Sequence, residues 1–203
     1  MAKAEFWNLR AKLVGNLLPL LLGAPFFIYG VILARQTHVL IGKDLIFLAI
    51  GVLLPTLFLN WLAMVGNKSI KTSFYARHSR AFHKPDALDS FFCGLAWPEF
   101  SSLLDPHQDV GYLTLDKGEV HYFGEQFRFQ IEIKDISSIR WKKNPHSFLG
   151  LGGFLAITWS DQGKTEVVFL ESRNESNLLA NKKKTKQFMS KALDQLRLMK
   201  PGT

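Results

Sequence analysis

Two long apolar segments near the start of this chain limit what it can fold into. Residues 13–34 and residues 45–65 form runs of 22 and 21 residues that contain no Asp, Glu, Lys, Arg or His. At about 1.5 Å per residue, a helix of about 21 residues is about 32 Å long, close to the ~30 Å hydrocarbon thickness of a bilayer. We therefore expect a hairpin of two transmembrane helices, over residues 13–34 and 45–65, that follows a short tail of residues 1–12.

Basic residues around this hairpin predict its orientation. Residues 1–12 contain three Lys or Arg, the connecting residues 35–44 contain two, and residues 66–84 contain five. Cytoplasmic flanks of transmembrane helices are enriched in Lys and Arg. No small-residue cleavage site follows the first segment, so it is read as a retained helix. The sequence thus predicts an integral, two-pass membrane protein with both termini in the cytoplasm. A bacterial inner membrane fits best, and an internal eukaryotic membrane stays open.

Small and polar residues inside the two segments are candidates for packing within the membrane. Gly15, Gly23 and Gly30 recur at spacings of eight and seven residues on one helical face, where small residues permit close helix approach. Asn16 and Asn60 are expected at similar depth. A hydrogen bond between these two side chains would satisfy both, and water or lipid headgroups are equally acceptable partners.

Composition and motifs argue against several classes of function. The chain has a formal net charge of +8, and Cys93 is its only cysteine, so an internal disulfide and a Cys-rich metal site are excluded. Its six histidines form no H-x-x-x-H or H-E-x-x-H pair, and no serine lies in a G-x-S-x-G elbow. We predict no catalytic residue, no metal site and no cofactor. Nucleic acid is disfavoured because the basic charge comes without a nucleic-acid-binding motif.

Residues 67–96 are predicted to be a juxtamembrane linker, followed by a folded domain over residues 97–203. The linker is basic with interspersed aromatic residues. It could lie along an anionic membrane surface, or it could be a plain flank that satisfies the topology. Residues 97–104 are expected to supply the first strand of the domain.

After Gly111 the hydrophobic period becomes two, which is typical of half-buried strands. The clearest case is residues 127–133, where four apolar residues alternate with three polar ones. Further strands are predicted at residues 112–115, 120–123, 136–141, 154–159 and 165–170. A C-terminal helix is predicted from an apolar face made of Phe188, Met189, Ala192, Leu193, Leu196 and Met199.

These elements predict one fold class. An antiparallel sheet of this size has open edges and an exposed apolar end, and curling it around a closing helix buries both. We therefore expect a membrane α-hairpin joined to an α+β domain. That domain would be a partly open antiparallel β-barrel of six or seven strands capped by the C-terminal α-helix.

This order of strands and helix resembles the pleckstrin-homology (PH) superfold, in particular the GRAM-like and bacterial PH-like domains. The resemblance covers about 90 residues, through Gly111-Tyr-Leu-Thr-Leu, Val120-His-Tyr-Phe-Gly, Ile131-Glu-Ile-Lys-Asp-Ile-Ser-Ser-Ile, Leu155-Ala-Ile-Thr-Trp, Val167-Val-Phe-Leu and the closing helix. Bacterial members are often joined to transmembrane hairpins. The resemblance implies a binding or scaffolding module without catalysis. One departure is the loop of residues 105–110, which has two Asp and no Lys or Arg. PH domains that bind phosphoinositides usually carry basic residues there.

Two surface features are candidate sites for lipid or a partner. The loop that follows residues 140–143 mixes cations with an apolar, glycine-rich tip, and it could dip into the bilayer or be a flexible connection. The lysine run of residues 182–186 could hold anionic lipid or an acidic partner, or be a solvated helix start. The candidate residues are Arg140, Lys142, Lys143, Phe148, Lys182, Lys183, Lys184 and Lys186.

Three functional hypotheses follow from the sequence. The first is a membrane-anchored, non-catalytic PH-like module that recruits or regulates a protein partner at the cytoplasmic membrane face. The second is a structural accessory subunit of a membrane complex that uses the hairpin as its interface. The third is an anionic-lipid-binding module. All three have the lipid bilayer as a partner, and homo-oligomerisation is left open.

Overall fold

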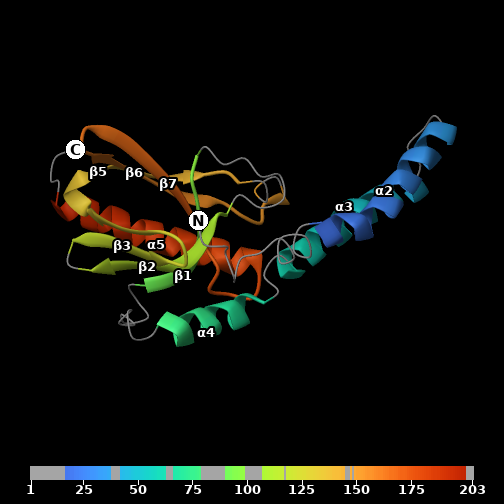
Figure 1. Cartoon of the computed structure of the whole chain (residues 1–203). Coiled ribbons are helices and arrows are strands. Elements are labelled where there is room, and N and C mark those ends of the chain that lie inside the picture. Colours follow the sequence, from blue (N-terminus) through green and yellow to red (C-terminus); the bar gives the residue numbers. More distant parts are fainter. Residues whose placement is uncertain are drawn as a thin grey trace.

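The computed structural model describes residues 17–37, 42–62, 66–78, 90–98, 107–116, 118–144, 147 and 149–199. A pair of helices projects from a folded domain (Figure 1). The domain contains a seven-stranded antiparallel sheet and a long C-terminal helix, which confirms the predicted α+β class.

The projecting pair consists of α2 (Leu18–Thr37) and α3 (Gly42–Leu62), which lie side by side. α2 ends three residues later than predicted and α3 begins three residues earlier. Small residues let the two backbones approach closely. A Cβ at Gly23 would collide with the Pro55 ring, and a Cβ at Gly51 would collide with Phe27. Gly30 likewise faces Leu48.

Most of the outward surface of the pair is apolar. Leu21, Leu53 and Leu57 are 59%, 60% and 61% exposed. Among the described helices, α3 alone has a stretch long and apolar enough to cross a membrane, Asp44–Trp61. The apolar stretch of α2, Leu21–Gln36, is shorter.

The sheet is a continuous antiparallel ladder that is open at one place. Its strand order is β4-β3-β2-β1-β7-β6-β5. The 3₁₀ turn η2 (Ile133–Asp135) joins the two edge strands, β4 and β5, which are not paired with each other. This arrangement is compatible with a partly open barrel. The strands are β1 (Ser90–Ala96), β2 (Asp109–Asp116), β3 (Glu119–Gly124), β4 (Arg128–Glu132), β5 (Ile136–Lys142), β6 (Phe154–Asp161) and β7 (Lys164–Ser172).

Helix α5 (Leu178–Met199) packs against the inner face of the curled sheet (Figure 1). Its Phe188 and Ala192 are buried, and the Phe188 ring centroid lies 4.4 Å from that of Phe91 on β1. The core that they join is made of inward-facing side chains from all seven strands. Its largest fully buried members include Tyr122, Leu95, Leu113, Ile136, Leu155, Ile157 and Leu170.

The described parts of the predicted linker, residues 67–78 and 90–96 of the range 67–96, form a helix and a strand of the fold. The described strand that precedes β2 is β1, Ser90–Ala96. Trp97 and Pro98, where the first strand was expected to begin, lie outside it, and residues 99–104 lie outside the described residues. Helix α4 (Asn67–His78) also falls within this segment. Phe74 of α4 is fully buried, with ring centroids 5.9 Å from Phe92 and 6.0 Å from Tyr112. α4 therefore covers the outer face of β1 and β2, and the domain begins well before residue 97.

Asp109, buried at the start of β2, organises the turn between β3 and β4. Its Oδ1 accepts hydrogen bonds from the backbone N–H groups of Glu125 (3.1 Å) and Gln126 (3.2 Å), and Oδ2 accepts one from Phe127 (3.0 Å). Burial raises the pKa of Asp109, and these N–H groups counteract that effect. A Cβ at position 124 would collide with the carboxylate, so Gly124 lets it approach.

We predict that Asp109→Ala lowers the free energy of unfolding by about 2–4 kcal/mol, because each buried N–H left without an acceptor costs about 1–3 kcal/mol. The measurement is urea unfolding of the full chain in detergent, monitored by tryptophan fluorescence. Asp194→Ala is the control, since Asp194 is exposed and makes only a 3.7 Å surface ion pair with Arg197. That variant should change stability by no more than about 0.5 kcal/mol. Equal losses in both variants would contradict the role assigned to Asp109.

Candidate functional site

The base of the helix pair meets the domain at a defined junction. Leu59 of α3 packs with Leu151 and with Leu178, the first residue of α5. Next to this contact, Oδ1 of Asn60 accepts the backbone N–H of Leu179 at 3.1 Å. A helix start has N–H groups without intrahelical partners, so Asn60 caps α5 from a different element. Asn16, one of the partners considered for Asn60, lies outside the described residues.

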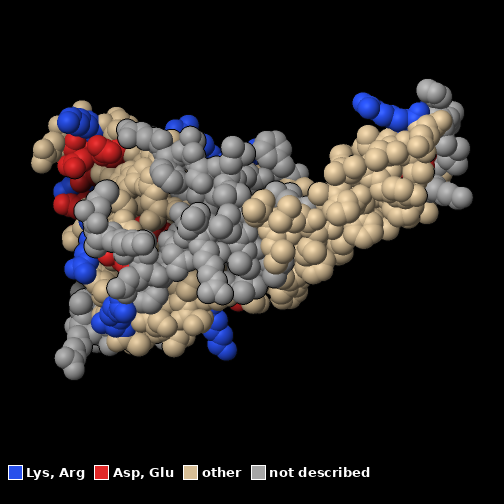
Figure 2. All heavy atoms as spheres, turned by 45° about the vertical axis from the view of Figure 1, so that its right-hand side comes forward, with Lys and Arg blue, Asp and Glu red and all other residues tan. Residues whose placement is uncertain are grey.

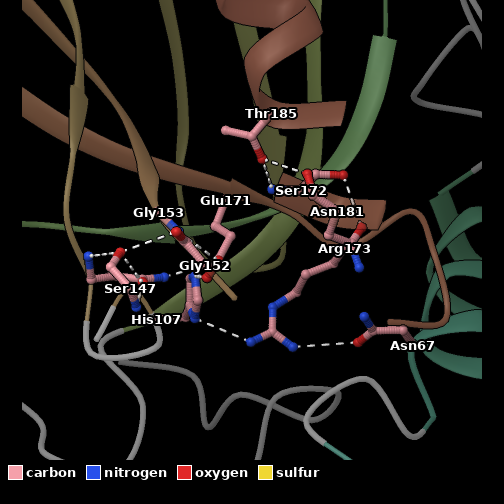
Figure 3. A network of polar contacts seen from close by, with 11 residues as sticks. Asn67, His107, Ser147, Gly152, Gly153, Glu171, Ser172, Arg173, Asn181 and Thr185 are labelled. Atoms are coloured by element: carbon pink, nitrogen blue, oxygen red, sulfur yellow. Dashed lines mark hydrogen bonds and ion pairs between the residues drawn. The ribbon is translucent and has the colours of Figure 1, made fainter. Parts of the chain in front are cut away.

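A buried polar network lies behind this junction (Figure 3). Arg173, which follows β7, donates from Nη1 to Oδ1 of Asn67 at 3.3 Å. Its Nη2 lies 3.1 Å from Nδ1 of His107. All three residues are at most 2% exposed. Asn67 is the first residue of α4, so the network ties the start of α4 to the end of β7.

The tautomer of His107 follows from its neighbours. Arginine can only donate, so Nδ1 must be the accepting nitrogen and the ring proton is on Nε2. Nε2 faces Oε2 of Glu171 at 3.4 Å, which is close enough for electrostatic attraction but long for a hydrogen bond. Gly94 on β1 makes room for the ring, since a Cβ there would collide with it.

Glu171 extends the network to the loop between β5 and β6. Its Oε1 accepts a hydrogen bond from Nδ2 of Asn144 at 2.9 Å and a longer one from the N–H of Gly153 at 3.4 Å. Asn144 is in turn bonded to Ser147. The Glu171 carboxylate and the Arg173 guanidinium thus lie on opposite sides of His107, and the charge of one compensates that of the other.

A second set of polar contacts fixes the start of α5. The N–H of Ser172 donates to Oγ1 of Thr185 at 2.9 Å, and Oγ of Ser172 donates to Oδ1 of Asn181 at 3.0 Å. Asn181 and Thr185 are fully buried. These buried contacts join α4 and α5 to the end of β7.

An open groove of about 780 Å³ lies beside the junction, between the end of α3, α4 and the turn from β7 to α5. Its lining includes Trp61 of α3, Lys68 and Lys71 of α4, and Asn174 and Glu175 from the turn after β7. Gly66, with φ of 84°, lies directly before α4 and adopts the left-handed conformation that favours glycine.

The structure places the predicted basic residues on other surfaces. Arg140 and Lys142 lie on β5 and line a hollow of about 440 Å³, where Nζ of Lys142 is 3.9 Å from the centroid of the Phe169 ring. Lys143 follows β5 and is exposed, and Phe148 lies outside the described residues.

The lysine run lies on α5. Lys182, Lys183 and Lys186 line a shallow hollow of about 430 Å³, whereas Lys184 is exposed outside it. Nζ of Lys182 donates to the carbonyl oxygen of Gly150 at 2.7 Å. Nζ of Lys186 lies 5.3 Å from the Trp141 ring of β5, so the two predicted surfaces adjoin.

Two of the three glycines proposed for packing within the membrane lie in the described residues. Gly23 and Gly30 both face α3, and Gly15 lies outside the described residues. Within the described ranges, no group of three His, Cys, Asp or Glu side chains is arranged to hold a metal ion. Sequence reasoning did not single out Asn67, Glu171 or Arg173. No local signal could have found them, because Arg173 is 106 residues from Asn67 and 66 from His107.

Comparison with known proteins gives no further guide to the site: no protein-family model matches the chain, and no curated protein matches its sequence.

We predict that Asn67→Ala lowers the free energy of unfolding by about 1.5–3 kcal/mol, the usual worth of a hydrogen bond to a charged group. The loss should appear in urea unfolding of the full chain. Ser69→Ala on the same helix is the control, because Ser69 is exposed and its change should stay within about 0.5 kcal/mol. If Asn67→Ala is as stable as Ser69→Ala, the hydrogen bond between Arg173 and Asn67 does not hold α4 in place.

Proposed function

We propose that this chain is a non-catalytic, PH-like module that is anchored in a membrane by α2 and α3 and recruits or regulates a protein partner at the cytoplasmic face. The observation that carries the proposal is the helix pair, whose apolar side chains face outward along its length. Such a surface is unfavourable in water and suits a lipid environment.

The distribution of charge on the helix pair supports the anchor. Figure 2 shows the shaft of the pair without Lys or Arg among its described residues, and blue atoms of a basic residue at its far end. Arg35 lies in the last turn of α2, and Asp44 lies in the first turn of α3. Charges at the tip and none along the shaft are typical of helices that span a bilayer.

The junction supports a scaffolding role. Leu59 and Asn60 contact the first turn of α5, and Asn67 contacts Arg173. A domain fixed in this way would be held at a constant height and orientation above the membrane. Constant presentation of a binding surface is what a recruiting module requires.

The sheet offers a surface for the partner. β5 is an edge strand, and exposed edges can accept an added strand from a peptide. Trp141 of β5 and Lys186 of α5 lie side by side next to this edge, and Arg140 adds a further cation. An extended peptide with acidic side chains would complement this surface.

The accessory-subunit alternative loses part of its basis. Its proposed interface is the hairpin, yet the hairpin glycines Gly23 and Gly30 face α3 of the same chain. These two glycines therefore serve packing within the hairpin.

We predict that the full chain stays in the membrane pellet after extraction at pH 11, and that single cysteines report the predicted topology. Cys93→Ala provides the background. Burial raises the pKa of the Cys93 thiol, so this residue should react slowly in any case. A membrane-impermeant thiol reagent applied to intact cells should label Thr37→Cys at the hairpin tip. It should label Ser160→Cys, exposed on β6, only after lysis.

Two results would count against the proposal. Release of the chain at pH 11 would show that α2 and α3 do not insert. Labelling of Ser160→Cys in intact cells, with Thr37→Cys protected, would place the domain outside the cytoplasm.

A further inference from the structure

The groove at the base of the helix pair has the features of a ligand site. It has a volume of about 780 Å³, and Trp61 at its edge is 55% exposed in the last turn of α3. We propose that this groove binds the phosphate of an anionic phospholipid, with Lys68 and Lys71 as the charged partners. This inference rests on the proposed membrane anchor.

The position of the groove favours a lipid. It begins where the apolar surface of α3 ends, next to a tryptophan, and tryptophan is enriched at the level of lipid headgroups. A phosphate in the groove would leave its acyl chains beside the exposed leucines of α3. A soluble anion would use the lysines but not this neighbouring apolar surface.

One of the two lysines is held in place. Nζ of Lys71 donates to Oδ1 of Asn174 at 2.6 Å, and the same oxygen accepts the N–H of Phe92 at 3.3 Å. Asn174 is therefore fixed to β1, and it positions the Lys71 ammonium group in the groove. Burial raises the pKa of Tyr112 to about 12, so this lining phenol keeps its proton and can donate a hydrogen bond.

The charge of the lining indicates which phosphate fits. Two lysines and the carboxylate of Glu175 give a net charge of +1. That value matches the single negative charge of a phosphodiester such as phosphatidylglycerol. Glu175 would repel the second negative charge of a phosphate monoester or of inorganic phosphate. Helix α4 contains no acidic residue, so the two charged residues that it contributes to the groove lining, Lys68 and Lys71, are both basic.

The test is lipid binding by the delipidated full chain in detergent. Binding is measured by native mass spectrometry and by the rise in melting temperature. The probes are phosphatidylglycerol, phosphatidylcholine and inorganic phosphate at matched concentrations. At about 1 kcal/mol per basic residue, Lys68→Gln should weaken phosphatidylglycerol binding about fivefold, and Lys68→Gln with Lys71→Gln about 30-fold. Because Lys68 is exposed, Lys68→Gln should have the same melting temperature as the wild type when no lipid is added.

The matched control is Lys134→Gln with Lys164→Gln, which removes the same charge from two exposed positions of the domain. Its affinity for phosphatidylglycerol should stay within about twofold of the wild type, because these lysines do not line the groove. Equal weakening in both double variants would overturn the site, since the attraction would then be general. Equal stabilisation by inorganic phosphate, or equal binding of phosphatidylcholine, would overturn the assignment to an anionic phosphodiester lipid.

The two proposals can fail separately. A chain that resists extraction at pH 11 but binds phosphatidylglycerol no less tightly after loss of Lys68 and Lys71 overturns the headgroup site and leaves the anchor intact. A chain released at pH 11 overturns the anchor, and with it the reason to expect a lipid at this groove.

Discussion

The buried guanidinium of Arg173 is the constraint on which the arrangement of the molecule depends. A buried charge is costly unless its donors are satisfied, and breaking such a set by removing one partner is strongly destabilising. The Nη1 and Nη2 atoms of Arg173 contact Asn67 from α4 and His107 from the segment before β2, with Glu171 beyond the imidazole (Figure 3). These partners come from separate parts of the chain and must all arrive for the charge to be buried. The end of β7 therefore sets where α4 begins, and so where α3 ends.

The two faces of the sheet explain which elements could be predicted from the sequence. β4 has one face toward the core and one toward solvent, so its alternating pattern was recognised. β1 is buried on both faces, because α4 covers it outside and α5 lies inside, so its apolar run carries no such alternation. The apolar face predicted for the C-terminal helix begins only at Phe188, ten residues after α5 begins, for a related reason. The inward contacts of the preceding part of α5 are made by Asn181 and Thr185, which interrupt the apolar stripe that begins at Phe188.

The candidate site was less accessible to sequence reasoning than the fold. In the sequence, Phe74 is one of several aromatic residues in a basic segment. In the structure, it is fully buried between α4 and the sheet, whereas Lys68 on the same helix lines the groove. Only the packing of α4 on the sheet separates these roles. The hydrogen bond between Asn60 and Leu179 is harder still to predict, because the two residues are 119 positions apart and share no sequence pattern. Periodicity predicts elements, whereas the contacts between them depend on the assembled fold.

The hydrogen bond that Asn60 accepts from Leu179 links the helix pair to the start of α5. α3 contacts the first turn of α5, and α5 then runs 22 residues across the sheet, a length of about 33 Å. Helices in a bilayer change tilt when the bilayer thickness does not match their apolar length. If α3 spans a membrane as we propose and this joint is rigid, a 10° change in the tilt of α3 would move the far end of α5 by about 6 Å. A change in bilayer thickness would thus become a change in the distance between the membrane and whatever the domain holds.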